Sequence, residues 1–408
     1  MKPDSDILIV GGGLNGPALA LALAQGGFGV TVVDALPLAA LIDHDFDGRA
    51  YALALASKQM LDALDIWAGV SNDSQPILDI IASDGRPGEG AAPWILHFDH
   101  QEIEEGPVGY MLEDRYLRRA LLNAVVAHPG ITMINERRVT AQSVHQTHAE
   151  VTLDDGETLS AGLVIGCDGR DSGTAKRAGI SRTGWGYDQT GLVCAIAHEK
   201  PHNGIAQQFF MPSGPLGILP LPGNRCSIVW AETTERANWI KTLSDEDYLA
   251  ELRPRFGDFL GGISLEGERF SYPLKLTVAN SFVDDRLALV GDAAHGMHPL
   301  AGQGLNMGLR DVAALAEVLI LAKRRGEDFA SPLVLDRYQQ WRMFDTAAMA
   351  VATDGINKLF SNDNPILRAG RDLGLGLVNA MPNIRRGLMR QAAGLTGDLP
   401  KLMQGQAI

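Results

Sequence analysis

The chain opens with a strand, a glycine-rich turn and a helix in direct succession, and this order constrains its fold more than any other feature. Residues 7–10 (Ile-Leu-Ile-Val) predict a buried strand, and residues 17–25 predict a helix. The turn between them carries Gly11, Gly13 and Gly16 in the pattern G-x-G-x-x-G. Gly11 allows the tight turn, Gly13 lets a pyrophosphate approach the backbone, and Gly16 lets the helix pack on the strand. The pattern predicts a Rossmann-like α/β domain that binds a dinucleotide.

The next predicted strand, residues 29–33, ends in an acid. Asp34 follows Gly13 by 21 positions, which is the spacing at which a carboxylate meets the ribose hydroxyls of the adenosine half. Asp34 is therefore expected to bind ribose. This fingerprint alone does not distinguish NAD from FAD.

A strand that ends in Gly-Asp lies far downstream. Residues 286–290 predict a buried strand that delivers Gly291 and Asp292 to the carboxyl edge of the sheet. An ionised Asp292 accepts charge-assisted hydrogen bonds from hydroxyl groups, such as those of a ribityl chain. A nicotinamide dehydrogenase has no use for this turn, so it favours a flavin. A glycine-rich turn without a ligand is the simpler alternative.

The loop after this acid has features that suit a flat ring. Pro299 fixes φ without offering a donor, and Gly302 and Gly304 let the backbone approach a ring where a Cβ would collide. A helix is expected from Leu305 onward. The amides of Leu305 and Asn306 would then stabilise the negative charge of a reduced flavin around N1 and the C2 carbonyl.

A third predicted strand, residues 162–165, precedes an acid-glycine turn at Asp168. It would return the chain to the same crevice, where Asp168 would contact the cofactor or shape a passage for a nicotinamide donor. Ordinary turn chemistry explains Asp-Gly after a strand equally well.

Together, the three motifs resemble those of the FAD-dependent aromatic hydroxylases, the superfamily of para-hydroxybenzoate hydroxylase. Residues 298–311 resemble more closely the ubiquinone-biosynthesis hydroxylases that act on octaprenyl phenols. The resemblance extends to residues 47–53, 212–221 and 354–363, and so covers essentially the whole chain.

The resemblance implies roles for several residues. Arg49 would lie near the FAD pyrophosphate, and Arg115 is a second candidate for that place, although a surface salt bridge explains Arg115 equally well. Pro299 would face the flavin ring where oxygen reacts. His295 and His298 are candidates for proton transfer by their position in the same segment.

The resemblance also implies an activity. FAD, reduced by NADH, NADPH or a protein donor, would react with molecular oxygen to give a C4a-hydroperoxide that hydroxylates the ring of a prenylated phenol in ubiquinone biosynthesis. The partners would be this hydrophobic phenolic substrate and, as candidates, other ubiquinone-biosynthesis proteins and the membrane surface. The alternatives are a hydroxylase of a small soluble phenol and a flavin-binding assembly component without catalysis.

The motifs and the strand spacing predict a discontinuous organisation. We expect a Rossmann-like FAD-binding domain, an inserted, mostly antiparallel β-sheet substrate domain and a helical C-terminus. The expected limits are 1–75, 110–180 and 276–330 for the FAD-binding domain, 76–109 and 181–275 for the substrate domain, and 331–408 for the C-terminal helical region.

Composition excludes some function classes. The formal net charge of −14 argues against a nucleic-acid binder, which needs a basic surface to displace counterions. Cys167, Cys194 and Cys226 form no C-x-x-C pair and predict buried free thiols in a reducing compartment. Neither a signal peptide nor an apolar run of 18 residues is evident, so the expected location is cytoplasmic, with the inner membrane surface as a peripheral site.

One segment satisfies a zinc pattern in letters only. His198-Glu-Lys-Pro-His202 fits H-E-x-x-H, but both histidines must project from one helical face, and Pro201 disfavours that helix. The remaining histidines show no ligand spacing. We therefore predict no metal.

The tail is basic in an acidic protein. Residues 361–408 hold six basic and three acidic side chains, with leucines between them. A peripheral membrane or partner-docking helix pair is one interpretation, and ordinary packing of terminal helices is the other.

Overall fold

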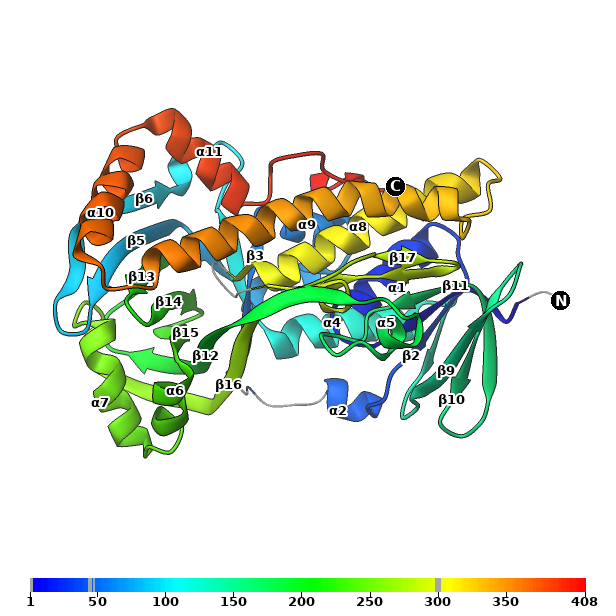
Figure 1. Ribbon diagram of the computed structural model, residues 1–408, viewed down its shortest axis with the longest axis horizontal. Helices are drawn as coiled ribbons and strands as arrows, with labels where there is room; N and C mark the ends of the chain where they lie inside the picture. Colours follow the sequence, from blue (N-terminus) through cyan, green and yellow to red (C-terminus); the bar gives the residue numbers. More distant parts are fainter. Residues whose placement is uncertain (1–2, 43–45, 47, 298–301) are drawn as a thin grey trace.

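The computed structural model describes residues 3–42, 46, 48–297 and 302–408. Two large sheets lie side by side along the molecule, and the long helix α9 (Pro332–Phe360) runs across both of them (Figure 1). This mixed α/β architecture with a helical C-terminus confirms the fold class expected from the sequence.

The first sheet contains the predicted nucleotide-binding strands. Its order is β17-β18-β11-β1-β2-β8, and β9 and β10 extend it beside β11. Its strands are β1 (Ser5–Val10), β2 (Val30–Val33), β8 (Ile131–Ile134), β9 (Val139–Val144), β10 (Ala149–Leu153), β11 (Thr158–Gly166), β17 (Val283–Asp284) and β18 (Leu287–Leu289). Strands β18, β11, β1, β2 and β8 are parallel. Their carboxyl ends therefore meet at one edge, as the clustering of a ligand site requires.

Helices cover this sheet because its strands are apolar on both faces. The main ones are α1 (Asn15–Gln25), α4 (Asp114–Ala127) and α8 (Gln303–Arg324), and the short helices are α2 (Leu38–Ile42) and α5 (Gly173–Arg177). Helices α1 and α8 pack against one another in the largest apolar core of the chain.

The second sheet is mostly antiparallel, in the order β19-β16-β12-β15-β14-β13-β5-β6. Its strands are β5 (Asp79–Arg86), β6 (Gly90–Asp99), β12 (Arg182–His198), β13 (Ile205–Met211), β14 (Gly214–Leu221), β15 (Arg225–Thr233), β16 (Ile263–Ala279) and β19 (His295–Gly296). Helices α6 (Thr234–Ile240) and α7 (Asp245–Phe256) pack on it around Trp230 and Tyr248. The paired 17-residue strands β12 and β16 reach back toward the first sheet, so the two sheets are joined by continuous backbone.

A small third sheet, in the order β3-β7-β4, lies between the large ones. Its strands are β3 (Ala50–Ala54), β4 (Gln75–Ile77) and β7 (Gly109–Glu113), and α3 (Leu55–Ala63) follows β3 directly. The C-terminal helices are α9 (Pro332–Phe360), α10 (Pro365–Asn379) and α11 (Pro382–Ala392). The domain limits expected from the sequence stay a prediction.

Candidate functional site

The turn between β1 and α1 has the geometry that its glycines imply. Gly11 has φ +111°, and a Cβ on it would lie 2.4 Å from the carbonyl oxygen of Cys167. A Cβ on Gly16 would lie 2.0 Å from the carbonyl oxygen of Gly11, so α1 packs directly on the turn. A Cβ on Gly13 would meet no described atom within 4 Å. Gly11 and Gly16 are thus required by packing, whereas Gly13 leaves open space for a ligand.

Asp34 lies at the end of β2, beside this turn. Its Oδ2 accepts a hydrogen bond from the amide of Gly12 at 2.6 Å, and its Oδ1 accepts one from the amide of Leu36 at 2.8 Å. Each carboxylate oxygen has a second lone pair, so the group can still accept from ribose hydroxyls.

Asp292 lies at the same sheet edge, after β18. Its Oδ2 accepts a hydrogen bond from Nε of Arg170 at 2.9 Å, and its side chain is 39% exposed. Its Oδ1 accepts no hydrogen bond from a described residue and can accept one from a ribityl hydroxyl. The two carboxylates, as hydrogen-bond acceptors, and the open space at Gly13 therefore fit the FAD that the sequence predicts.

Gly291 and Gly308 make room for the side chain of Asn15, a residue for which no role was predicted from the sequence. A Cβ on Gly291, which has φ +62°, would lie 2.2 Å from Nδ2 of Asn15, and a Cβ on Gly308 would lie 2.4 Å from the same atom. Asn15 is the first residue of α1 and directly follows the first glycine turn, so its side chain packs this turn against the Gly-Asp turn and α8. The first glycine turn and the Gly-Asp turn are therefore joined through the side chain of Asn15.

A buried charge cluster lies behind the Gly-Asp turn. Asp311 on α8 accepts hydrogen bonds through Oδ2 from the amide of Gly291 at 3.0 Å and from Nε2 of His295 at 2.6 Å. Its Oδ1 accepts a bond from Nε of Arg342 on α9 at 2.8 Å, and all three side chains are at most 1% exposed. Burial alone would raise the pKa of Asp311, but His295 and Arg342 outweigh it and hold the pKa below its ordinary value. The ionised carboxylate therefore holds the turn in place.

Arg182 holds the same turn from β12. Its Nη1 donates to the carbonyl oxygen of Ala293 at 2.7 Å, and its Nη2 donates to the carbonyl oxygen of Asp292 at 3.1 Å. Burial lowers the pKa of Arg182. Neither Asp311 nor Arg182 was given a role by the sequence, although an acid on the apolar face of a helix was a usable signal for Asp311.

The start of α8 is fixed by Asn306. Its Oδ1 accepts from the amide of Ala54 and the hydroxyl of Ser57, each at 2.8 Å. Its Nδ2 donates to the carbonyl oxygens of Ala52 at 2.8 Å and Gly302 at 3.1 Å. The side chain of Asn306 thus joins the glycine loop to β3.

The helix begins at Gln303, earlier than the sequence suggested, and Gly302 before it has φ +64°. The amides of Gly304 and Leu305 lie in its first turn and have no carbonyl acceptor within the helix, whereas that of Asn306 is placed to form the first helical bond. A Cβ on Gly304 would meet no described atom within 4 Å. His298 and Pro299 lie outside the described residues.

Asp168 is engaged by its own turn. Its Oδ2 accepts from the amide and the hydroxyl of Thr174, each at 2.9 Å, and its Oδ1 accepts from the hydroxyl of Ser172. These bonds stabilise the start of α5, which is the turn chemistry that the sequence left open as the alternative.

The two predicted pyrophosphate ligands differ in their surroundings. Arg49 is 45% exposed, and its Nη2 lies 3.9 Å from Oδ2 of the buried Asp114. Arg115 donates to Glu113 at 2.7 Å and stacks over the rings of Phe46 and Tyr116. The guanidinium of Arg49 is therefore partly accessible to solvent beside Asp114, whereas Arg115 is held by Glu113 and two aromatic rings.

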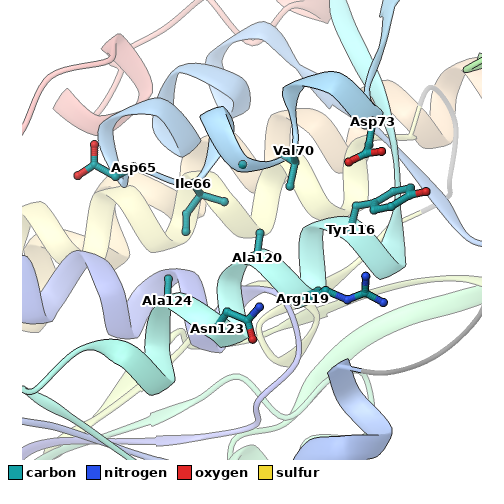
Figure 2. Close-up of a pocket in the computed structure, with 10 residues that line it drawn as sticks. Asp65, Ile66, Val70, Asp73, Tyr116, Arg119, Ala120, Asn123 and Ala124 are labelled. Carbon is teal, nitrogen blue, oxygen red and sulfur yellow. The ribbon is translucent and has the colours of Figure 1, made fainter.

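A separate pocket of about 410 Å³ lies between α4 and the loop that follows α3. Asp65, Ile66, Val70 and Tyr116 are among its lining residues (Figure 2). No predicted FAD ligand lines it. It is therefore distinct from the crevice at the sheet edge.

The zinc-like segment forms no helix. Strand β12 ends at His198, and Nδ1 of His198 lies 2.8 Å from the carbonyl oxygen of Lys200. Nε2 of His202 contacts the carbonyl oxygen of Leu221, also at 2.8 Å. Both rings are held by backbone groups, in agreement with the argument from Pro201.

Comparison with known proteins identifies the family. A model of the FAD binding domain matches residues 4–353. Ubiquinone hydroxylase UbiL of Rhodospirillum rubrum is 46% identical over 98% of this chain and 93% of its own length. The chain belongs to the ubiquinone hydroxylase family. Members of this family are FAD-dependent monooxygenases, so the resemblance stated from the motifs is confirmed.

A second ubiquinone hydroxylase and a solved structure are also similar to this chain. The 3-demethoxyubiquinol 3-hydroxylase of Escherichia coli is 37% identical over 96% of this chain and 99% of its own. The crystal structure of p-nitrophenol 4-monooxygenase PnpA from Pseudomonas putida superposes with a TM-score of 0.80 at 20% identity, covering 97% of this chain and 99% of that one. That likeness shows that the two proteins share a fold.

Proposed function

We propose that this ubiquinone hydroxylase family member hydroxylates the aromatic ring of a prenylated phenol on the route to ubiquinone. The proposal rests on the names of its relatives and on one feature of the site. A buried apolar cluster lies where β12 and β16 meet α8 and α9, immediately before the loop predicted to face the flavin. Its members are Leu276, Met297, Met307 and Ala350, with Tyr187, Val278 and Met349 packed against them.

This cluster suits an apolar, irregular substrate. Methionine has an unbranched, flexible side chain, so Met297, Met307 and Met349 can adapt to a prenyl tail. An apolar surrounding also excludes water from the reaction.

We propose a contact for each part of FAD among the described residues. Gly13 and Arg49 would contact the pyrophosphate, Asp34 the adenosine ribose, Asp292 the ribityl chain, and the amides of Gly304 and Leu305 the pyrimidine edge of the ring. Bound FAD supplies the oxygen chemistry, with NADH, NADPH or a protein donor as reductant. The chain's own part is to hold the ring, orient the phenol and keep water away.

Turnover with matched substrates tests the proposal. The FAD-loaded chain is supplied with NADH or NADPH, labelled oxygen and either a prenylated phenol or the same phenol without its tail. We expect one labelled oxygen atom in the product and a kcat/KM at least about tenfold higher for the prenylated phenol, because each buried methylene contributes about 0.8 kcal/mol. Equal kcat/KM would favour a small soluble phenol. Reductant oxidation without any product, with every donor, would favour a non-catalytic flavin protein.

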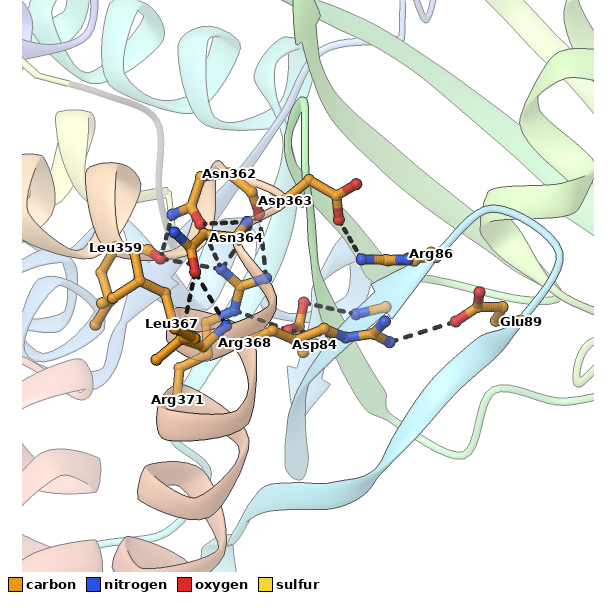
Figure 3. A network of polar contacts seen from close by, with 12 residues as sticks. Asp84, Arg86, Glu89, Leu359, Asn362, Asp363, Asn364, Leu367, Arg368 and Arg371 are labelled. Atoms are coloured by element: carbon orange, nitrogen blue, oxygen red, sulfur yellow. Dashed lines mark hydrogen bonds and ion pairs between the residues drawn. The ribbon is translucent and has the colours of Figure 1, made fainter.

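Most basic side chains of the tail form ion pairs with other residues of the protein. Nε of Arg371 lies 2.8 Å from Oδ2 of Asp84, and both side chains are 1% exposed (Figure 3). Arg368 pairs with Glu89, Arg385 with Glu102, and Arg390 with Glu105. Four of the six basic side chains therefore fasten α10 and α11 to residues 84–105. Their positive charge is thus explained by packing.

The exposed apolar residues of the tail are not explained by packing. Helix α10 carries Ile366, which is 81% exposed, with Leu373 and Leu377 on the same face. Helix α11 carries Ile384 and Leu388, which are also exposed and lie one turn apart on the same face. We propose that this face lies on the surface of a lipid bilayer, where a prenylated substrate resides. In the described residues, no helix has both the length and the apolar character needed to cross a membrane.

Liposome flotation tests this placement. Ile366→Asp should at least halve the fraction of protein that floats with vesicles containing anionic lipid. Leu333→Asp is the matched control, because Leu333 is also 81% exposed but lies at the far end of α9. Equal flotation of both variants and the unaltered chain would refute a membrane role for α10.

A further inference from the structure

The hairpin between β9 and β10 carries a compact group of metal-ligating atoms. His145, His148 and Glu150 each offer one ligand atom, and these atoms lie within 4.8 Å of one another. The hairpin is at the end of the molecule that lies opposite β13 and β14 (Figure 1). No metal was expected from the sequence, because the two histidines flank a reverse turn and Glu150 comes from the strand after it.

Two of the three distances between ligand atoms match those of a tetrahedral site, and the third, between the two imidazole nitrogens, is at most 4.8 Å. Nε2 of His145 lies 3.3 Å from Oε2 of Glu150, and Nε2 of His148 lies 3.2 Å from Oε1 of the same carboxylate. Ligand bonds of 2.0–2.1 Å in a tetrahedral zinc site place neighbouring ligand atoms about 3.3 Å apart. Small rotations of three partly exposed side chains would therefore complete the three-ligand geometry.

The two imidazoles are already arranged for binding. The rings of His145 and His148 stack with centroids 4.7 Å apart and planes at 19°, and both direct Nε2 toward Glu150. The other nitrogen of His148, Nδ1, lies 3.3 Å from the hydroxyl of Thr147. Such a contact on the second nitrogen is how proteins orient a ligating imidazole.

The turn is held by a hydrogen bond of its own backbone and by Arg286 from outside the hairpin. The amide of His145 donates to the carbonyl oxygen of His148 at 2.8 Å, which closes the turn. Nη2 of Arg286 donates to the carbonyl oxygen of Gln146 at 3.2 Å and to Oδ2 of Asp328 at 2.6 Å. Arg286 therefore connects the turn to the segment before α9. Because the turn is already ordered, metal binding does not have to order it.

We propose that His145, His148 and Glu150 form a binding site for a divalent transition metal of the zinc class. Two imidazoles and one carboxylate suit Zn²⁺, Co²⁺ or Ni²⁺ better than Mg²⁺ or Ca²⁺, which prefer oxygen ligands. The side chains of His145, His148 and Glu150 are 46%, 23% and 36% exposed, so the ion can enter from solvent and keep water as its fourth ligand. The site is independent of the flavin crevice and adds a cross-link across the hairpin.

Zinc titration of the FAD-loaded full chain tests the site. After chelator treatment, the protein competes with a chromophoric zinc indicator of micromolar affinity. The unaltered chain should bind one zinc equivalent that His148→Ala and Glu150→Gln bind at least about tenfold more weakly. The matched control is His97→Ala, because Nε2 of His97 pairs with one carboxylate, Asp79, at 2.8 Å. It should leave zinc binding unchanged.

Cobalt provides a second readout. Co²⁺ in a site with three protein ligands should give visible absorption bands that disappear in His145→Ala. No zinc uptake at micromolar concentration, equal uptake by all variants, or loss of uptake in His97→Ala would each overturn the proposal. The variants replace surface side chains, and their unfolding midpoints without metal should match that of the unaltered chain.

Discussion

Nε2 of His295 lies 2.6 Å from Oδ2 of Asp311, and neither side chain is accessible to solvent beyond 1%. The same carboxylate oxygen accepts a bond from the amide of Gly291, which precedes the predicted ribityl ligand. An ionised carboxylate only accepts hydrogen bonds, so Nε2 of His295 donates in this contact. One buried acid thus connects α8, α9 and the Gly-Asp turn.

Asp311→Asn should weaken both the fold and the binding of FAD. The change leaves the guanidinium of Arg342 buried with less compensation, so we expect a loss of about 3 kcal/mol in the free energy of unfolding. Loss of the charged acceptor for Gly291 should weaken FAD binding about tenfold. Urea unfolding and flavin-fluorescence titration measure the two effects.

Asp345→Asn is the matched control for this prediction. Asp345 accepts from Nη1 of Arg342 at 2.7 Å, but its side chain is 28% exposed and does not contact Gly291. Solvent screening should keep its effect below about 1 kcal/mol and leave FAD binding unchanged. Equal losses in both variants would mean that Asp311 has no special role at the turn.

The lowered pKa of Asp311 also predicts an acid dependence. A group whose pKa is lowered by folding contributes stability above its unfolded pKa of about 3.9, and this contribution is lost as the pH falls through the folded value. The difference in unfolding free energy between the unaltered chain and Asp311→Asn should therefore shrink as the pH falls below about pH 4. A constant difference down to pH 3 would contradict this.

Substitutions of Gly291 and Gly304 should distinguish a glycine required by packing from one that contacts the cofactor. Gly291→Ala places a Cβ against Asn15 at a positive φ, so the apoprotein should lose about 2 kcal/mol or more. Gly304→Ala should leave the apoprotein as stable or up to about 1 kcal/mol more stable, because alanine favours a helix. It should nevertheless weaken FAD binding, because the new Cβ would fill space predicted for the ring. Unaltered affinity in Gly304→Ala would remove this residue from the site.

The sequence predicted the local parts of this site and not the long-range ones. Gly11, Asp34 and Asp292 could be predicted, because the roles expected of them follow from neighbours within one strand-turn-helix unit. Arg342 could not be assigned, because its partner Asp311 lies on another helix and the pairing depends on how α8 and α9 pack. The distances between the side chains of the β9–β10 turn could not be predicted from spacing in the sequence either.

The cysteines give a prediction about reactivity. All three are free; Cys194 and Cys226 are buried, as expected, whereas Cys167 is only partly buried. Burial raises the pKa of Cys194 to about 11 and that of Cys226 to about 12. At pH 8 the thiolate fraction of Cys194 is then roughly one in a thousand, so alkylation should be negligible in the folded chain and complete in urea. Rapid labelling of Cys194 or Cys226 in the folded protein would contradict their placement.

The most direct test of the account is the FAD affinity of Asp292→Ala, measured beside Asp284→Ala as a control. Asp284 is an exposed acid on β17, next to β18 but away from the carboxyl edge. Asp292 is expected to make charge-assisted hydrogen bonds of about 1.5–3 kcal/mol each with the ribityl chain. We predict that Asp292→Ala weakens FAD binding at least about 100-fold and that Asp284→Ala leaves it unchanged. Retention of FAD by Asp292→Ala with the affinity of the unaltered chain would contradict the central claim.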